Sequence, residues 1–138
     1  MTGIRPGRAG DRPRILEIQA QCLEAAQWDP SQYLDHYFQV AEAEDRVVGF
    51  LVARRVYGGE WEILNLATDP RHRRKGVARR LVAELLTSGV ETVFLEVRES
   101  NVAAQELYKS LGFNAVSTRK DYYQNPPESA IVLKFHSC

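Results

Sequence analysis

The chain has 138 residues, of which 44% are hydrophobic and 26% charged, and its formal net charge is zero. This size and composition predict a single soluble domain over residues 1–138, and the balanced charge gives no support for direct nucleic-acid binding or for membrane binding. No apolar run approaches the roughly 18 residues of a membrane span. Residues 1–15 lack the apolar centre of a secretory leader, so we expect a cytoplasmic protein.

The cysteines and histidines show neither metal-binding nor redox spacing. Cys22 and Cys138 are far apart in sequence, so we expect two free thiols in a reducing compartment. His36, His72 and His136 are isolated from one another. We therefore expect no metal site and no histidine-based catalytic site.

The first half of the chain predicts two helices followed by three antiparallel strands. Ile4–Pro6 can form an edge strand, where proline is tolerated. Asp11 is a candidate N-cap for a helix that ends near residue 22 or 23, and Asp29 or Ser31 can cap a second, short helix. The hydrophobic period then changes to two. Strands are expected at residues 38–43, 47–56 and 61–68, with a hairpin turn at Gly58-Gly59.

The second half alternates helices and strands. Residues 77–86 carry an apolar helical stripe, and Gly89 is expected at the C′ position that ends this helix. The apolar run at 92–97 should pair in parallel with the 61–68 strand, because a helix connects them. A further helix, capped by Ser100 or Asn101, should end at Gly112. We then expect a strand at 113–118, a polar loop at 121–127 and a last strand at 130–135.

These elements predict an α/β fold with a mixed sheet of six to seven strands flanked by about four helices. Its centre is the segment from residue 61 to residue 86, where a strand, a basic glycine-containing turn and a helix follow one another. Glycine at position 76 allows close backbone approach, and the N–H groups of a helix's first turn can bind phosphate. The same segment also fits an ordinary loop with a solvated charge run.

Two side chains on apolar patterns could carry chemistry. Glu96 interrupts the run TVFLEV, where an unpaired charge would be costly. It is either a functional carboxylate or a sheet-end residue that faces solvent or pairs with Arg98. Tyr108 lies on the apolar face of its helix and is either a core aromatic or a phenol that donates a proton into a cleft. Asn101 can be a helix cap or a ligand contact.

Three segments resemble known enzymes. The spacing Arg73-x-x-Gly76-x-Ala78 is similar to the acyl-CoA pyrophosphate loop of the GNAT N-acetyltransferase superfamily. LEVRESNVAAQELYKSLGF, from Leu95 to Phe113, resembles the second signature of these enzymes. With NLATDP (65–70) and RKDYYQNPPESAIVL (119–133), it resembles the RimI group, ribosomal-protein-alanine N-acetyltransferases that acetylate a protein N-terminus.

The resemblance implies a GNAT fold, acetyl-CoA as cosubstrate and a set of site residues. Glu96 would accept a proton and Tyr108 would donate one. Trp28, Tyr122 and Tyr123 would contact the acceptor. The implied cofactor-binding residues are Leu66, Ala67, Thr68, Arg73, Arg74, Lys75, Gly76, Val77, Ala78, Arg79 and Asn101. One departure concerns the acceptor side, because Ala26-Gln27 precedes Trp28 where the family commonly has an aromatic residue and a proline.

We therefore expect an acetyltransferase that acts on an α-amino group of a protein N-terminus, with a ribosomal protein as one candidate partner. At neutral pH, removing the proton that blocks the nitrogen lone pair costs about 1.4 kcal/mol for an α-amine and about 4.6 kcal/mol for a lysine. This difference favours an N-terminal amine as the acceptor but does not exclude lysine or small amines. Two alternatives remain open at this point. A small-molecule amine would need a closed acceptor pocket, whereas a peptide needs an open groove between the Trp28 loop and residues 121–127. A non-catalytic acyl-CoA-binding module would not need both Glu96 and Tyr108.

Overall fold

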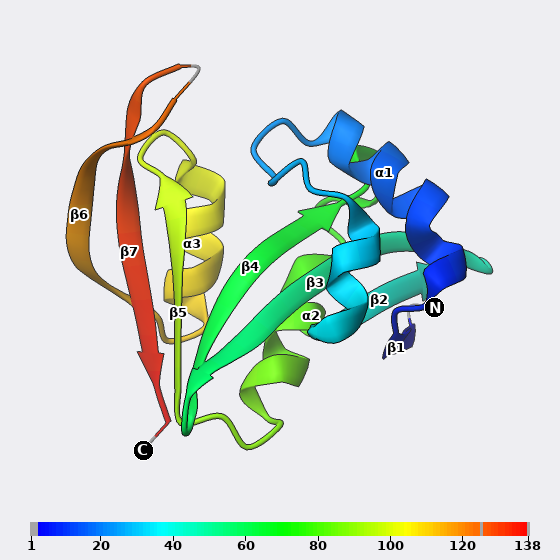
Figure 1. Ribbon diagram of the computed structural model, residues 1–138, viewed down its shortest axis with the longest axis horizontal. Coiled ribbons are helices and arrows are strands. Elements are labelled where there is room, and N and C mark those ends of the chain that lie inside the picture. The colour runs from blue at the N-terminus through cyan, green and yellow to red at the C-terminus, as the bar shows by residue number, and fades with distance from the viewer. Residues whose placement is uncertain (1–2, 125, 138) are drawn as a thin grey trace. The chain divides into compact units, whose positions relative to one another are not determined.

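The computed structural model describes residues 3–124 and 126–137. These residues form a mixed α/β fold with a seven-stranded sheet in the order β1-β2-β3-β4-β5-β7-β6 (Figure 1). The fold class predicted from the sequence is confirmed. In chain order the elements are β1 (Gly3–Pro6), η1 (Ala9–Asp11), α1 (Arg12–Gln21), η2 (Pro30–Asp35), β2 (Tyr37–Ala43), β3 (Arg46–Tyr57), β4 (Glu60–Thr68), η3 (Pro70–His72), α2 (Val77–Leu86), β5 (Thr92–Arg98), α3 (Val102–Ser110), β6 (Asn114–Tyr123) and β7 (Glu128–His136).

The chain divides into two compact units, and each is described by itself. The first unit runs up to Arg54 and includes Ile63–Thr87. The second unit holds Arg55–Glu62 and the residues from Ser88 onward. The tip of the β3–β4 hairpin therefore belongs to the second unit. The expectation of one domain over residues 1–138 stays a prediction.

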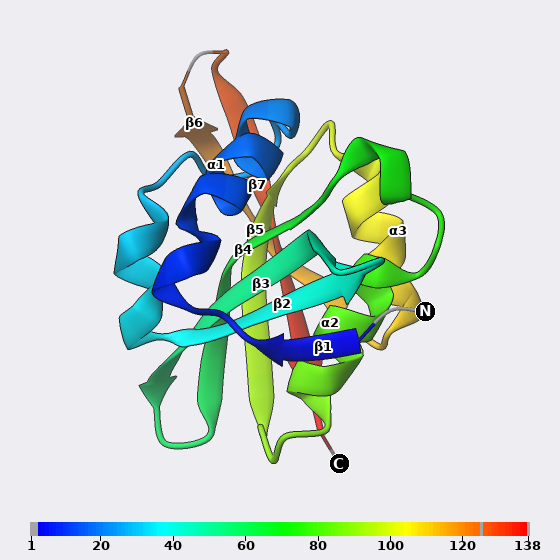
Figure 2. The ribbon, with the colours of Figure 1, turned by 90° about the vertical axis from the view of Figure 1, so that its right-hand side faces the viewer.

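In the first unit, β1, β2 and β3 form an antiparallel layer with β1 at its outer edge (Figure 2). Phe50 of β3 joins an apolar cluster with Ile15 and Ile18 of α1. The Cβ position of Gly49 faces the opposite side of the layer from the Phe50 side chain, because successive side chains alternate along a strand. A Cβ at Gly49 would lie only 2.8 Å from Cγ1 of Val77, so α2 packs directly on the strand backbone. The two helices therefore cover opposite faces of this layer.

In the second unit, β5, β7 and β6 lie side by side as antiparallel neighbours (Figure 1). The start of β4 pairs with β5 in parallel over Glu60–Glu62, as the sequence predicted. An aromatic row packs α3 against β7. The ring centroids of Tyr108 and Phe113 lie 5.2 Å apart, and those of Phe113 and Phe135 lie 5.5 Å apart.

Residues 121–127, which we expected to form a loop, differ most from the prediction. Strand β6 continues to Tyr123, so Asp121 lies inside the strand. The register with β7 shifts between Arg119 and Tyr123, and Asp121 has a φ of 52°. A bulge allows a strand to absorb extra residues and still continue pairing. Polar composition alone cannot distinguish such a strand from a loop.

Smaller differences concern the ends of helices. Asp11 is the N-cap residue of α1, as predicted, but its carboxylate binds the Arg5 side chain and makes no cap bond to the helix. The second predicted helix is the 3-10 helix η2, with Asp29 as its cap. Helix α2 has its C-cap at Thr87, so Gly89 lies one residue beyond the expected C′ position.

Cys22 is a buried free thiol, as expected, whereas Cys138 lies outside the described residues. Among residues 3–124 and 126–137, no helix is long and apolar enough to cross a membrane. In the same residues, no group of three or more His, Cys, Asp or Glu side chains is placed to hold a metal ion.

Candidate active site

The end of β4 is fixed by Asp69, which follows the strand directly. Its carboxylate accepts a hydrogen bond from the N–H of Arg71 at 3.0 Å and pairs with the Arg14 guanidinium at 2.5 Å. Burial alone would raise the pKa of Asp69, but these two donors outweigh it and lower the pKa. The strand therefore leads into the basic turn with a defined direction.

The turn itself places two residues in the left-handed region, Arg74 with φ of 64° and Gly76 with φ of 78°. Gly76 is the N-cap of α2 and supplies no side-chain cap. An α-helix leaves the N–H groups of its first turn without intrahelical acceptors. A Cβ on Gly76 would meet no atom within 4 Å, so the space beside it is open. Open space, free helix-end donors and flanking basic residues together suit a phosphate group.

The backbone of Leu66, Ala67 and Thr68 forms the end of β4. The Leu66 N–H donates to Oδ1 of Asn65 at 3.1 Å, and the Thr68 carbonyl accepts from Sγ of Cys22 at 3.3 Å. This segment is thus held by neighbouring side chains.

The loop that carries Trp28 is attached to β4 through Asn65. Oδ1 of Asn65 accepts from the Ala26 N–H at 3.1 Å, and its Nδ2 donates to the Ala26 carbonyl at 2.9 Å. Gln27 donates from Nε2 to the carbonyl of Gln19 at 2.7 Å. Gln19 in turn donates to the carbonyl of Trp28 at 2.8 Å. The loop backbone is therefore fixed, while the Trp28 side chain remains 45% exposed.

Asn65 and Gln19 were missed as site-forming residues by the sequence analysis. Both are buried, and together with Tyr33 they form a polar cluster in which the Tyr33 hydroxyl donates to Oε1 of Gln19 at 2.6 Å. Buried polar side chains need hydrogen-bond partners. An asparagine inside the apolar run of β4 was the available signal, of the same kind that singled out Glu96.

Glu96 of β5 is held on one oxygen only. Its Oε1 accepts a hydrogen bond from Nη1 of Arg119 at 2.7 Å. Its Oε2 is buried and has no hydrogen-bond partner in the described part of the chain. The predicted alternative partner, Arg98, pairs instead with Glu128 at 3.2 Å. The partner of Glu96 is therefore Arg119 and not Arg98. Oε2 of Glu96 is the oxygen that remains available to accept a proton.

Two neighbouring tyrosines lie close to this carboxylate. Burial, followed by the hydrogen-bonding and charge effects of Glu96, raises the pKa of Tyr122. Burial and then the charge of Glu96 raise the pKa of Tyr123 to about 12. Arg119 stacks on the Tyr122 ring with its Cζ 4.4 Å from the centroid. Both predicted acceptor-side tyrosines are thus brought near the predicted base.

Tyr108 is only 3% exposed and packs edge-on against Phe113. Burial raises the pKa of its phenol well above the ordinary value. Within the described residues, the hydroxyl makes no hydrogen bond. Tyr108 is therefore a core aromatic, which was one of the two alternatives left open by the sequence. Its role as a proton donor stays a prediction.

Asn101 is the N-cap of α3, with Oδ1 accepting from the Ala104 N–H at 3.2 Å. The capping alternative from the sequence is thus confirmed. Capping uses only one atom of the amide, so Nδ2 can still donate a hydrogen bond to a ligand. Its cofactor contact stays a prediction.

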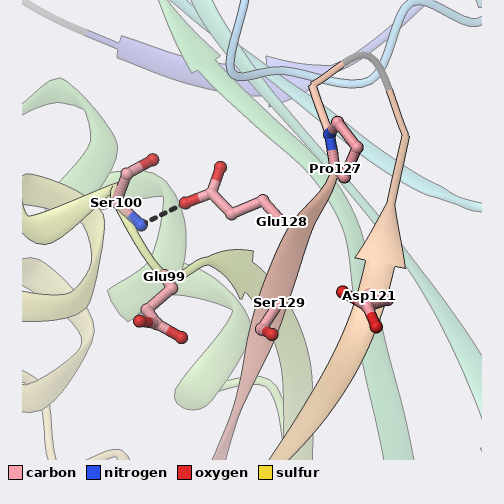
Figure 3. A pocket seen from close by; sticks show the side chains of 6 residues that line it. All are labelled: Glu99, Ser100, Asp121, Pro127, Glu128 and Ser129. Atoms are coloured by element: carbon pink, nitrogen blue, oxygen red, sulfur yellow. Dashed lines mark hydrogen bonds between the residues drawn. The ribbon is translucent and has the colours of Figure 1, made fainter.

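A cavity of about 360 Å³ lies at one end of the β5, β6 and β7 strands (Figure 3). Figure 3 shows the Glu128 side chain pointing toward the backbone N–H of Ser100. Oε2 of Glu128 accepts a hydrogen bond from this N–H at 2.5 Å. The lining of the cavity comprises Glu99, Ser100, Asp121, Pro127, Glu128 and Ser129.

Comparison with known proteins identifies the family to which the chain belongs. The family model described as the acetyltransferase (GNAT) family matches residues 11–113, which include the turn, Glu96 and Tyr108. The chain belongs to the GNAT acetyltransferase family. A curated relative, the ribosomal protein bS18-alanine N-acetyltransferase of Escherichia coli K12, is 44% identical over 133 residues, or 89% of each chain.

Solved structures agree with this GNAT assignment. The ribosomal-protein-S18-alanine N-acetyltransferase of Escherichia coli superposes with a TM-score of 0.84 and 29% identity over the structural alignment, covering 99% of this chain and 94% of that one. Ard1 from Thermoplasma volcanium has a TM-score of 0.89 and 27% identity, with 99% and 98% covered. The resemblance read from the sequence motifs is confirmed.

GNAT acetyltransferases use acetyl-CoA as cosubstrate. The residues of the turn before α2 fit its pyrophosphate, because Gly76 leaves open space beside uncapped helix N–H groups. Arg74 and Lys75 are exposed next to this position and add positive charge. The donor set is therefore that of an anion site. The contacts of individual residues with the cofactor stay predictions.

We expect Gly76→Ala to weaken acetyl-CoA binding about tenfold, which corresponds to about 1.4 kcal/mol. A side chain at φ of 78° strains the turn, and its methyl group would occupy the open space beside the helix N–H groups. Calorimetric titration with acetyl-CoA measures the effect. Gly89→Ala is the matched control, since Gly89 also has positive φ and open surroundings. Equal acetyl-CoA affinities in the two variants would contradict the placement of the pyrophosphate.

Proposed function

We propose that this chain transfers the acetyl group of acetyl-CoA to the α-amino group of a protein N-terminus, with an alanine N-terminus of a ribosomal protein as the acceptor. The observation that carries the proposal is the 44% identity, over 89% of each chain, with an enzyme named for this reaction. A ribosomal acceptor would place the enzyme in the cytoplasm.

When bound, acetyl-CoA supplies an acetyl group activated as a thioester. In our proposal, residues 73–79 hold its pyrophosphate through backbone N–H groups and basic side chains. The backbone of residues 66–68, at the end of β4, holds the pantetheine arm. Asn101 contributes its amide from the start of α3. These residues do the positioning that an intermolecular transfer needs.

Glu96 is proposed as the general base, because its Oε2 is buried and unpaired among the described residues. Tyr108 is proposed as the general acid, because it matches the proton donor of the family's second signature and a phenol carries its proton at neutral pH. Trp28, Tyr122 and Tyr123 are proposed to contact the acceptor. Each role belongs to a residue of this chain, and no covalent enzyme intermediate is required.

The residues before Trp28, Ala26 and Gln27, differ from the aromatic residue and proline common in the family, and their contacts bear on the acceptor. Ala26 and Gln27 fix the loop through hydrogen bonds to Asn65 and to the Gln19 carbonyl. A fixed loop does not need the aromatic and proline residues that are common there. The loop can therefore present Trp28 to a peptide by a different set of contacts.

The test is incubation with acetyl-CoA and a library of peptides that differ in their first residues, read by mass spectrometry. We expect acetylation at the α-amine, with peptides beginning in alanine among the preferred substrates. The same peptides with a blocked N-terminus and an internal lysine are the control. Acetylation of lysines or small amines alone would refute the acceptor assignment. If no amine released free thiol from acetyl-CoA, the chain would be a binding module.

A further inference from the structure

Arg119 is the side chain that pairs with the Glu96 carboxylate. It pairs with Oε1 at 2.7 Å, while Oε2 is buried and unpaired within the described residues. A buried oxygen without a partner is unfavourable in a merely structural ion pair. A carboxylate that is tied by one oxygen and bare on the other is what a positioned base requires.

The sheet brings the two side chains together across one strand. Glu96 of β5 is opposite Val132 of β7, and Arg119 of β6 is opposite Ala130 of the same strand. The guanidinium thus reaches over β7 to the carboxylate. Its hydrogen bond with Glu96 and the charge of that group raise the pKa of Arg119.

The bulge in β6 holds Arg119 in this position. Between Arg119 and Tyr123 the strand advances four residues, while its partner β7 advances two, from Ala130 to Glu128. In a regular strand, Arg119 and Tyr122 would point to opposite faces. With the bulge and the positive φ of Asp121, the Tyr122 ring instead lies 4.4 Å from the guanidinium. Arg119 is therefore held by a ring on one side and a carboxylate on the other.

We propose that Arg119 is a positioning residue for the reaction, which fixes the Glu96 carboxylate so that Oε2 accepts the proton of the acceptor amine. The inference rests on the proposed function. The proton leaves the acceptor nitrogen for Oε2, directly or through one water, and the electron pair of the N–H bond stays on nitrogen. Arg119 itself neither gains nor loses a proton.

The alternative is a surface ion pair without a kinetic role. Arg119 is 54% exposed at its side chain, and exposed ion pairs contribute little to stability. That alternative predicts nearly unchanged turnover in an Arg119 variant. The two readings therefore differ in kcat and not in the stability of the protein.

A double-mutant cycle tests the proposal, using Arg119→Gln, Glu96→Gln and the variant with both changes. We expect Arg119→Gln to lower kcat about tenfold, a part of the roughly 10²–10⁴-fold that a positioned base contributes. The KM for acetyl-CoA should not change. The double variant should be no slower than Glu96→Gln alone, because Arg119 acts only through that carboxylate. Arg119→Lys should recover part of the rate, since a point charge can pair but lacks the planar fork.

Lys120→Gln is the matched control, because it removes the same charge from the next position of the same strand. We expect wild-type kcat for it. The positioning role would be overturned if the Arg119→Gln and Glu96→Gln losses in kcat multiplied in the double variant. It would also be overturned if the kcat of Arg119→Gln lay within twofold of wild type. Neither result would affect the assignment of Glu96 as the base. A higher KM for the acceptor peptide at constant kcat would assign Arg119 to acceptor binding and also overturn the positioning role. Full activity of Glu96→Gln would overturn both the base assignment and this inference.

Discussion

Glu96→Gln is expected to lower kcat by about 10²–10⁴-fold, the usual contribution of a general base. Glutamine has nearly the same shape as glutamate and can still accept the hydrogen bond of Arg119 at Oε1. What it lacks is the ability to take a proton at the buried second oxygen. The loss should therefore appear in turnover, measured by thiol release from acetyl-CoA with a saturating acceptor peptide.

The affinity for acetyl-CoA should remain near wild type in this variant. Its stability should change by no more than about 1 kcal/mol, because the lost ion pair has a half-exposed partner. Glu106→Gln makes the same chemical change on α3 and is the control. A loss under about threefold across the pH range would leave Glu96 with only a structural role. A large loss of acetyl-CoA affinity would also contradict the assignment.

Local sequence pattern was sufficient for most of the fold. The strands at 61–68 and 92–97, their parallel pairing and the helix between them follow from hydrophobic period and from a crossover connection. The bulge in β6 does not follow from any such pattern. It depends on the register with β7, and a register is set by contacts between strands. For this reason residues 121–123 were predicted as loop.

In the candidate site, too, features set by local sequence were predicted, whereas contacts between residues distant in sequence were not. Gly76 was identified because a glycine in a basic turn between a strand and a helix is a local pattern that the sequence displays. The partner of Glu96 was not identified, since Arg119 lies 23 positions away on a strand two places along the sheet. Asn65 was missed for the same reason, because its partner Ala26 is 39 residues away.

Tyr108→Phe is expected to lower kcat by about tenfold or more while leaving the fold unchanged. General acids contribute roughly 10²–10⁴-fold, but a thiol, with pKa near 8.5, leaves readily without a proton donor, which places the effect at or below the lower end of this range. The variant keeps the ring that packs on Phe113 at 5.2 Å. It removes a hydroxyl that has no hydrogen-bond partner among the described residues, so the free energy of unfolding should change by less than about 1 kcal/mol.

The pH dependence provides a second check on Tyr108. Burial raises its pKa, and a group with a raised pKa keeps its proton to higher pH than an ordinary tyrosine does. Wild-type kcat should therefore show no loss from tyrosine ionisation up to about pH 10, the ordinary tyrosine value. The Tyr108→Phe deficit should be nearly constant over this range, because the proton that it lacks is present in the wild type throughout.

Denaturant unfolding and single-turnover rates on the same Tyr108→Phe sample distinguish its two possible roles. Tyr57→Phe is the control, since Tyr57 is 81% exposed and lies outside the site. A structural tyrosine predicts equal rates in both variants, because the ring carries the packing. A catalytic tyrosine predicts a slow acetyl transfer in Tyr108→Phe alone, with acetyl-CoA affinity preserved. A full single-turnover rate without the hydroxyl would make Tyr108 a core residue only, and proton donation would then have to come from solvent or from the acceptor.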